Sequence, residues 1–83
     1  MANIVIYSSA HCPYCDRAKQ LFDQKGAKYN EIRVDLDPKE REVMMERSGR
    51  RTVPQIFIDD QHIGGCDDLM ALAMAGKLDA LLK

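Results

Sequence analysis

The sequence lacks the features of a membrane-bound, secreted or nucleic-acid-binding protein. It contains no stretch near the roughly 18 consecutive apolar residues typical of a membrane-spanning helix. The formal net charge is only -1, which argues against the basic surface of a nucleic-acid-binding protein and against a polybasic membrane patch. No positive charge precedes the short apolar run in MANIVIYSS, so we expect no signal peptide. These absences predict a cytoplasmic protein with no nucleic-acid or membrane partner.

Cysteine is also scarce, with three residues in the chain. Cysteines in a reducing cytosol rarely form a permanent disulfide framework, so a purely structural disulfide is disfavoured. The remaining composition, 46% hydrophobic and 30% charged over 83 residues, is typical of a packed globule. No linker, repeat or low-complexity segment is evident, and we therefore expect residues 1–83 to form a single domain.

The apolar pattern predicts alternating strands and helices in the order β-α-β-α-β-β-α. The predicted elements are a strand at 3–7, a helix from Pro13 to before Gly26, a strand at 29–35, a helix from Asp37 to near Gly49, strands at 55–59 and 62–64, and helical segments around 69–73 and 78–82. The first strand-helix-strand unit requires a parallel pair with a right-handed crossover. The last two strands are joined by a link of hairpin length, although Asp60 stands where glycine turns more readily. We therefore expect a small layered α/β fold.

Two cysteines bracket Pro-Tyr in the stretch SSAHCPYCDRAK. Cys12 lies where the first predicted strand gives way to the first helix, and Cys15 lies one turn inside that helix. Unpaired N–H groups and the positive end of the helix dipole favour the thiolate at Cys12. Cys15 is further into the helix and on the side facing the core, so it lacks this stabilisation. The spacing predicts that Cys12 attacks and Cys15 resolves.

A zinc site is the main alternative for this motif. Structural zinc requires four ligands, typically as two spaced pairs. Besides the Cys12–Cys15 pair, the chain offers only Cys66, His11 and His62, with no second CxxC and no HxxxH motif. A CxxC motif beside a βαβ pattern in a cytosolic protein is instead typical of a thioredoxin-like redox site. We therefore expect dithiol chemistry and no metal.

Three motifs together resemble those of the dithiol glutaredoxins, and the short bacterial type is most similar. They are Cys12-Pro13-Tyr14-Cys15, Thr52-Val53-Pro54 and Gly64-Gly65-Cys66-Asp67-Asp68. The resemblance covers essentially the whole chain. It implies a thioredoxin fold, with a four-stranded mixed sheet of order 2-1-3-4 flanked by three or four helices. It also implies a glutathione-dependent thiol-disulfide oxidoreductase, which reduces protein disulfides and glutathione mixed disulfides through a redox-active Cys12–Cys15 disulfide and serves electron transfer and redox homeostasis.

The resemblance further implies a set of glutathione-binding residues, with glutathione as co-substrate and no tightly bound cofactor. The implied set is Tyr14, Arg41, Thr52, Val53, Pro54, Gly65, Cys66 and Asp67. A cis Val53–Pro54 bond is implied, with the Val53 N–H and C=O pairing with the cysteine of glutathione. Backbone amides near Cys66 and Asp67 would take the γ-glutamyl carboxylate, and the Asp67 side chain its ammonium.

The partners implied are disulfide-bonded or glutathionylated proteins, with ribonucleotide reductase as one family candidate, and the chain is expected to be a monomer. Arg41 is favoured over Arg51 for the glycine carboxylate of glutathione. Cys66 is expected to serve as a small residue at a helix start.

The chain departs from the family at Ser9, where many members carry a lysine three residues before the first cysteine. Without that cation the helix terminus contributes more to stabilising the thiolate. A protonated His11 would compensate, whereas the commoner role of a lone histidine there is a solvated surface residue. Two rival readings remain. An iron–sulfur scaffold usually has Gly-Phe-Ser after the cysteine, whereas Pro-Tyr-Cys favours disulfide chemistry. A thioredoxin proper more often carries Gly-Pro between the cysteines and a tryptophan before them, and this chain has no tryptophan.

Overall fold

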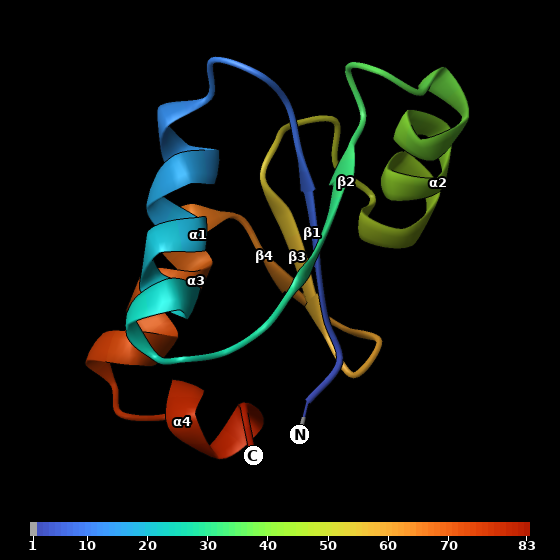
Figure 1. Cartoon of the computed structure of the whole chain (residues 1–83). Coiled ribbons are helices and arrows are strands. Elements are labelled where there is room, and N and C mark those ends of the chain that lie inside the picture. Colours follow the sequence, from blue (N-terminus) through green and yellow to red (C-terminus); the bar gives the residue numbers. More distant parts are fainter. Residues whose placement is uncertain (1) are drawn as a thin grey trace.

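The computed structural model in Figure 1 describes residues 2–83 and shows one sheet with helices on both faces. Its elements are β1 (Ile4–Ser8), α1 (Pro13–Gln24), β2 (Asn30–Arg33), α2 (Pro38–Ser48), β3 (Gln55–Ile58), β4 (Gln61–Gly64), α3 (Cys66–Met74) and α4 (Leu78–Leu81). The strand order is β2-β1-β3-β4. β1 pairs in parallel with β2 and antiparallel with β3, and β3 pairs antiparallel with β4. The mixed sheet of order 2-1-3-4 is therefore confirmed.

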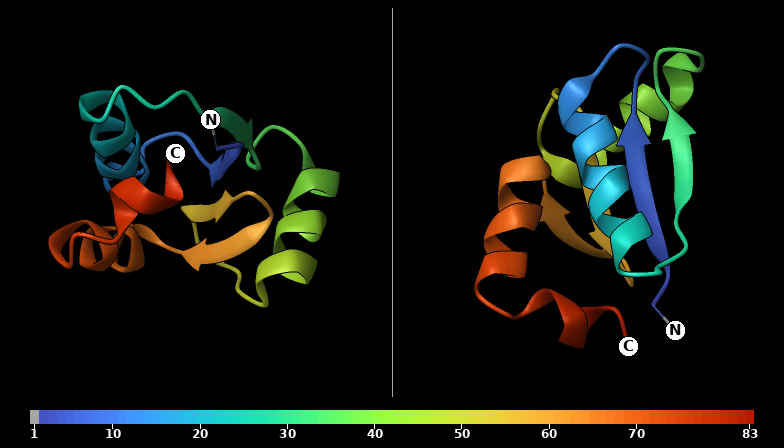
Figure 2. Two further views of the ribbon diagram at one scale, coloured as in Figure 1. Left: turned by 90° about the horizontal axis from the view of Figure 1, so that it is seen from below. Right: turned by 60° about the vertical axis from the view of Figure 1, so that its left-hand side comes forward.

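Two apolar clusters fill the space on the two sides of this sheet. α1 and α3 cover one face and α2 covers the other, as the view from below in Figure 2 shows. The larger cluster lies under α1, α3 and α4 and comprises Ile4, Ile6, Ala18, Phe22, Ile56, Ile58, Leu69 and Leu78. The smaller cluster lies under α2 and comprises Tyr7, Val34, Met44 and Phe57. Because side chains alternate along a strand, β1 and β3 supply residues to both clusters.

α2 buries only one of its residues, Met44, against the sheet. The helix begins with a cap, in which the Asp37 side chain accepts the Lys39 N–H at 3.1 Å. Arg47 adds a polar attachment to the sheet. Its Nη1 donates to the Tyr7 hydroxyl at 2.8 Å, and its guanidinium carbon lies 4.0 Å from the centre of the Phe57 ring. Polar and cation–π contacts thus replace part of an apolar interface.

The β3–β4 hairpin turns without glycine. Asp59 and Asp60 both adopt the left-handed conformation, with φ of 50° and 66°. A two-residue hairpin turn with positive φ at both positions matches the twist of the strands, and aspartate tolerates this region better than most residues. The short link expected from the sequence is therefore a tight turn.

The sheet topology brings three chain segments to the same edge. β1 ends there and leads into α1. Because β3 runs antiparallel to β1, the segment before β3 lies beside the end of β1, with Gln55 opposite Tyr7. β4 ends at the same edge, with Gly64 paired to Ile56, and α3 begins directly after it. The CxxC motif, the Thr52–Pro54 segment and the start of α3 therefore meet.

Candidate functional site

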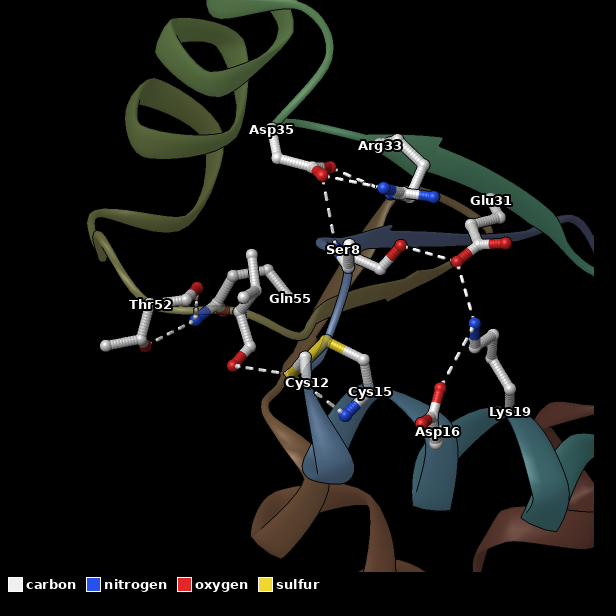
Figure 3. The surroundings of a disulfide bond; sticks show 12 residues. Ser8, Cys12, Cys15, Asp16, Lys19, Glu31, Arg33, Asp35, Thr52 and Gln55 are labelled. Carbon is white, nitrogen blue, oxygen red and sulfur yellow. Dashed lines mark hydrogen bonds and ion pairs between the residues drawn. A yellow bond between two sulfur atoms is a disulfide. The ribbon is translucent and has the colours of Figure 1, made fainter.

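The two cysteines differ sharply in their access to solvent. Cys12 is the N-cap residue of α1 and is partly exposed, whereas Cys15 is 0% exposed. They are joined by a disulfide, with their Cα atoms 5.2 Å apart (Figure 3). The Cys15 N–H donates to Cys12 Sγ at 3.2 Å, so the helix start supplies a hydrogen bond to that sulfur. An approaching substrate meets Cys12 first.

The segment before β3 faces the disulfide. Its Val53–Pro54 peptide bond is cis, as the family resemblance implied. The Val53 carbonyl oxygen lies 3.9 Å from Cys12 Sγ. Within residues 2–83 the Val53 N–H makes no hydrogen bond, and it therefore remains available to an extended ligand.

A buried glutamine holds this segment in place. Gln55 is 0% exposed, and its Nε2 donates to Thr52 O at 3.0 Å and to Thr52 Oγ1 at 3.2 Å. Its Oε1 lies 2.8 Å from His62 Nε2 on β4. Burial lowers the pKa of His62 and so favours the neutral form of its ring. The sequence reasoning missed Gln55, and the available signal was a polar residue opening an otherwise apolar strand.

A hollow of about 210 Å³ lies beside Cys12 across Val53, whose carbonyl oxygen is 3.9 Å from Cys12 Sγ, and it collects most of the predicted ligand-binding residues. It is lined by Tyr14, Arg50, Thr52, Val53, Pro54, Gly65, Cys66, Asp67 and Asp68. All the predicted glutathione contacts are in this set except Arg41, whose Nη2 donates instead to Arg51 O at 3.2 Å. Arg50 and Asp68 were not predicted. Nothing in the local sequence distinguishes Arg50 from the neighbouring Arg51.

The start of α3 forms one wall of this hollow. Asp68 Oδ2 accepts the Gly65 N–H at 2.9 Å and pairs with Arg50 Nη1 at 3.0 Å. These contacts lower the pKa of Asp68, the Gly65 hydrogen bond being the larger cause. The N–H groups of Cys66 and Asp67 belong to the first turn and have no partner within the helix, so they can donate hydrogen bonds to an anion. Cys66 itself is 4% exposed, and burial raises the pKa of its thiol, so it is a poor nucleophile.

A polar network lies on the other side of the motif (Figure 3). Ser8 ends β1 and is 0% exposed, and its hydroxyl donates to Glu31 Oε2. The same oxygen is 2.9 Å from Lys19 Nζ on α1. The Ser8 hydrogen bond is the main cause that lowers the pKa of Glu31, and Glu31 in turn raises the pKa of Lys19. β2 is thereby linked to both β1 and α1.

A CxxC disulfide at a helix N-terminus, facing a cis-proline segment on a sheet of order 2-1-3-4, defines the thioredoxin fold of dithiol oxidoreductases. Comparison with known proteins narrows this class. The glutaredoxin family model matches residues 4–63. The chain is 59% identical over 83 residues to glutaredoxin 3 of Escherichia coli (strain K12), and the match covers 100% of both chains.

Solved structures agree. The solution structure of glutaredoxin from Brucella melitensis has a TM-score of 0.88 at 57% identity, and the match covers 100% of this chain and 90% of that one. The crystal structure of the buckwheat glutaredoxin–glutathione complex has a TM-score of 0.90 at 40% identity, with 98% and 76% covered. The chain belongs to the glutaredoxin family. It is accordingly a glutathione-dependent thiol-disulfide oxidoreductase.

Across residues 2–83, no group of three or more His, Cys, Asp and Glu side chains is arranged to hold a metal ion. No helix in that range is long and apolar enough to cross a membrane.

Proposed function

We propose that Cys12 is the nucleophile and that Cys15 is the resolving cysteine. With a protein disulfide as substrate, the Cys12 thiolate attacks one sulfur, forms a mixed disulfide and releases the first protein thiol. Cys15 then attacks the Cys12 sulfur as a thiolate and releases the second thiol, which leaves Cys12–Cys15 oxidised. Two glutathione molecules reduce this disulfide by way of a Cys12–glutathione adduct and leave as glutathione disulfide. The difference in exposure between the two sulfurs, together with the Cys15 N–H bond to Cys12 Sγ, is the observation that carries this assignment.

With a glutathionylated protein, Cys12 alone completes the cycle. Its thiolate attacks the glutathione sulfur and releases the protein thiol. A second glutathione thiolate then attacks the Cys12–glutathione disulfide, forms glutathione disulfide and regenerates Cys12. No step of this route requires Cys15. The two cysteines therefore separate the two activities.

The hollow beside Cys12 is the proposed glutathione site. The Val53 N–H and C=O pair with the backbone of the glutathione cysteine, as in an added strand, which brings its sulfur to Cys12. The amides of Cys66 and Asp67 take the γ-glutamyl carboxylate, and the Asp67 carboxylate takes the ammonium. The remaining contacts of the proposed site are Tyr14, Thr52, Pro54 and Gly65, which line the hollow.

Arg41 stays in the proposed set for the glycine carboxylate, although it does not line the hollow. Its hydrogen bond to Arg51 O holds the backbone just before Thr52. An effect of Arg41 on glutathione binding would therefore act through this segment as well as through its charge.

A coupled assay with glutathione, glutathione reductase and NADPH tests the assignment, using a small glutathione mixed disulfide and a protein disulfide as substrates. Cys12→Ser should reduce both activities to background. Cys15→Ser should keep deglutathionylation and lose reduction of the protein disulfide. Cys66→Ser is the matched control for loss of a thiol, because serine keeps the backbone amide through which Cys66 is proposed to contact glutathione, and it should retain both activities within about twofold. Loss of both activities in Cys15→Ser, or retention of either in Cys12→Ser, would contradict the division of roles.

The domain organisation, oligomeric state, location and protein substrates are also proposals. Residues 1–83 act as one glutaredoxin domain, since both apolar clusters pack on a single sheet. A monomeric state is supported by the charged residues Glu31 and Arg33 on the edge strand β2, which discourage pairing between sheets. A cytoplasmic location is supported by the small number of cysteines and by the unpaired Cys66. Disulfide-bonded or glutathionylated proteins are the substrates, and ribonucleotide reductase is a family candidate.

A further inference from the structure

The turn that presents Cys12 is conformationally demanding. Ser9, Ala10 and His11 join β1 to the cap of α1. His11 has φ of 56°, in the left-handed region that residues with a side chain rarely adopt. Ala10 and His11 are both exposed, so burial in the core does not hold them. A strained residue beside a reactive group persists only where the surrounding structure fixes it.

Asp35 supplies that attachment from the segment after β2. Its Oδ2 accepts the Ala10 N–H at 3.2 Å. Arg33 holds the carboxylate from the other side, with Nε 2.7 Å from Oδ1 and Nη2 2.6 Å from Oδ2. The backbone next to Asp35 is fixed as well, because the Val34 N–H donates to Ser8 O at 2.9 Å. Figure 3 shows Asp35 and Arg33 above the end of β1, on the side of Ser8 away from the disulfide.

The charge of Asp35 has the wrong sign to stabilise a thiolate directly. A carboxylate near Cys12 disfavours a second negative charge, and Arg33 offsets this effect by pairing with it. Asp35 also does not line the hollow beside Cys12. Its contribution to the reaction is therefore geometric, through the Ala10 N–H.

We propose that Asp35, oriented by Arg33, is a positioning residue for Cys12. By holding the Ala10 N–H it fixes the turn through His11, and Cys12 Sγ is thereby kept at the helix cap and against the Val53 carbonyl. The inference rests on the proposed role of Cys12 as the nucleophile. Reactivity of Cys12 then requires a carboxylate outside the CxxC motif, on the segment after β2.

Two explanations for an effect of Asp35 predict opposite signs. If only charge mattered, Asp35→Ala would remove a negative group and leave Arg33 unpaired, so Cys12 would react faster. If positioning matters, Asp35→Ala slows Cys12. Asp35→Asn separates the two further, because its amide oxygen can still accept the Ala10 N–H, while the negative charge and the acceptor for Arg33 Nε are lost.

The experiment measures the alkylation rate of Cys12 in the reduced protein and the coupled turnover of a glutathione mixed disulfide. Asp35→Ala should lower both the alkylation rate and kcat by about fivefold, with the KM for the glutathione substrate unchanged. Asp35→Asn, which keeps the acceptor for the Ala10 N–H but not the one for Arg33 Nε, should be slowed less than Asp35→Ala. Asp37→Ala is the matched control, because it removes another exposed carboxylate that caps α2 and does not touch the turn. It should lower stability without slowing Cys12.

Several results would overturn the inference: equal rates in Asp35→Ala and wild type, a faster Cys12 in Asp35→Ala, an equal slowing in Asp37→Ala, or an Asn variant as slow as the Ala variant. Hydrogen exchange of the wild-type protein provides a test that does not depend on any variant. The Ala10 amide should exchange with solvent at least about tenfold more slowly than an unstructured amide, and exchange at the unstructured rate also rejects the proposal. Cys12→Ser in the same assay distinguishes a failure of this inference from a failure of the proposed nucleophile.

Discussion

Gly64, the last residue of β4, controls how α3 begins. Its φ is +120°, which residues with a side chain rarely adopt. A Cβ added there would lie 2.2 Å from Asp68 Oδ2 and 2.7 Å from Asp68 Cγ. Gly64→Ala therefore strains the backbone and forces the Asp68 carboxylate away from the Gly65 N–H and from Arg50. The wall of the hollow beside Cys12 shifts with it.

Three effects of Gly64→Ala lower the free energy of unfolding. Backbone strain in a sparsely populated region is worth about 1–3 kcal/mol. Losing the helix-start hydrogen bond costs about 1 kcal/mol, and the half-exposed pair with Arg50 adds only about 0.5 kcal/mol. The reduced freedom of alanine in the unfolded chain offsets about 0.5–1 kcal/mol. The net loss in the free energy of unfolding is about 3 kcal/mol, a large share of the 5–15 kcal/mol typical of a domain, and the midpoint should fall by roughly 10–20 °C.

Urea and thermal unfolding measure this loss, with Gly76→Ala as the matched control. Gly76 also has a positive φ, 73°, but no atom lies within 4 Å of an added Cβ. The control therefore meets strain without a clash and should lose less than about 1 kcal/mol. In the double variant Gly64→Ala/Asp68→Ala, most of the clash is gone, so the combined loss should be about 1–1.5 kcal/mol smaller than the sum of the single losses.

Three results would refute this reasoning. The free energy of unfolding of Gly64→Ala could lie within about 0.5 kcal/mol of the wild-type value, which is the size of an ordinary surface effect. Gly64→Ala could lose no more than Gly76→Ala. The two substitutions in the double variant could also be additive, in which case the carboxylate is not what the new side chain displaces.

Two further variants test the charges on either side of the disulfide. Asp67→Ala should raise the KM for a glutathionylated substrate about tenfold, because a charge-assisted contact to the ammonium is lost, while alkylation of Cys12 stays unchanged; an unchanged KM counts against the proposed γ-glutamyl contact. Glu31→Gln tests the Ser8–Glu31–Lys19 network. The pKa of Glu31 is lower in the folded than in the unfolded chain, so its stabilisation is present above the unfolded value of about 4.3 and is lost as the pH falls through the folded value. Urea unfolding should therefore show the wild type more stable than Glu31→Gln by about 1 kcal/mol at pH 7, with the gap closing in acid, and parallel pH curves would argue against the network.

The helices and strands were largely predictable because local rules set them. The β-branched run of β1 and the proline starts of α1 and α2 lie within a residue or two of the expected positions. The strand expected at 29–35 is shorter, Asn30–Arg33, because its partner β1 ends at Ser8. The Val34 N–H donates to Ser8 O, and beyond it only the Asp35 side chain reaches back, to the Ala10 N–H. α3 begins at Cys66, before the first leucine of its apolar face, since its start is set by Gly65 and Asp68.

The residues that support the site were not predictable, because tertiary contacts that a local pattern does not encode give them their partners. Gln55 is close in sequence to Thr52 and His62, but the pairing of β3 with β1 and β4 buries it and sets its contacts. Asp35 contacts Ala10 across 25 positions, and Arg50 contacts Asp68 across 18. A sequence pattern reports periodicity and neighbours, and it carries no record of such contacts.

The sequence by itself was enough to propose which sulfur reacts and which resolves, since the order Cys-Pro-Tyr-Cys at the start of a helix makes the two positions chemically unequal. It also determined the sheet order, through the resemblance of three motifs to one family. Only the tertiary structure decided which side chains surround that sulfur. The parallel crossover from β1 to β2 and the antiparallel pairing of β3 bring the Thr52–Pro54 segment, the start of α3 and the end of β2 to one end of the sheet. There Asp35 and Asp68 are each held by an arginine, and Asp68 is held by Arg50, which lies far from it in sequence.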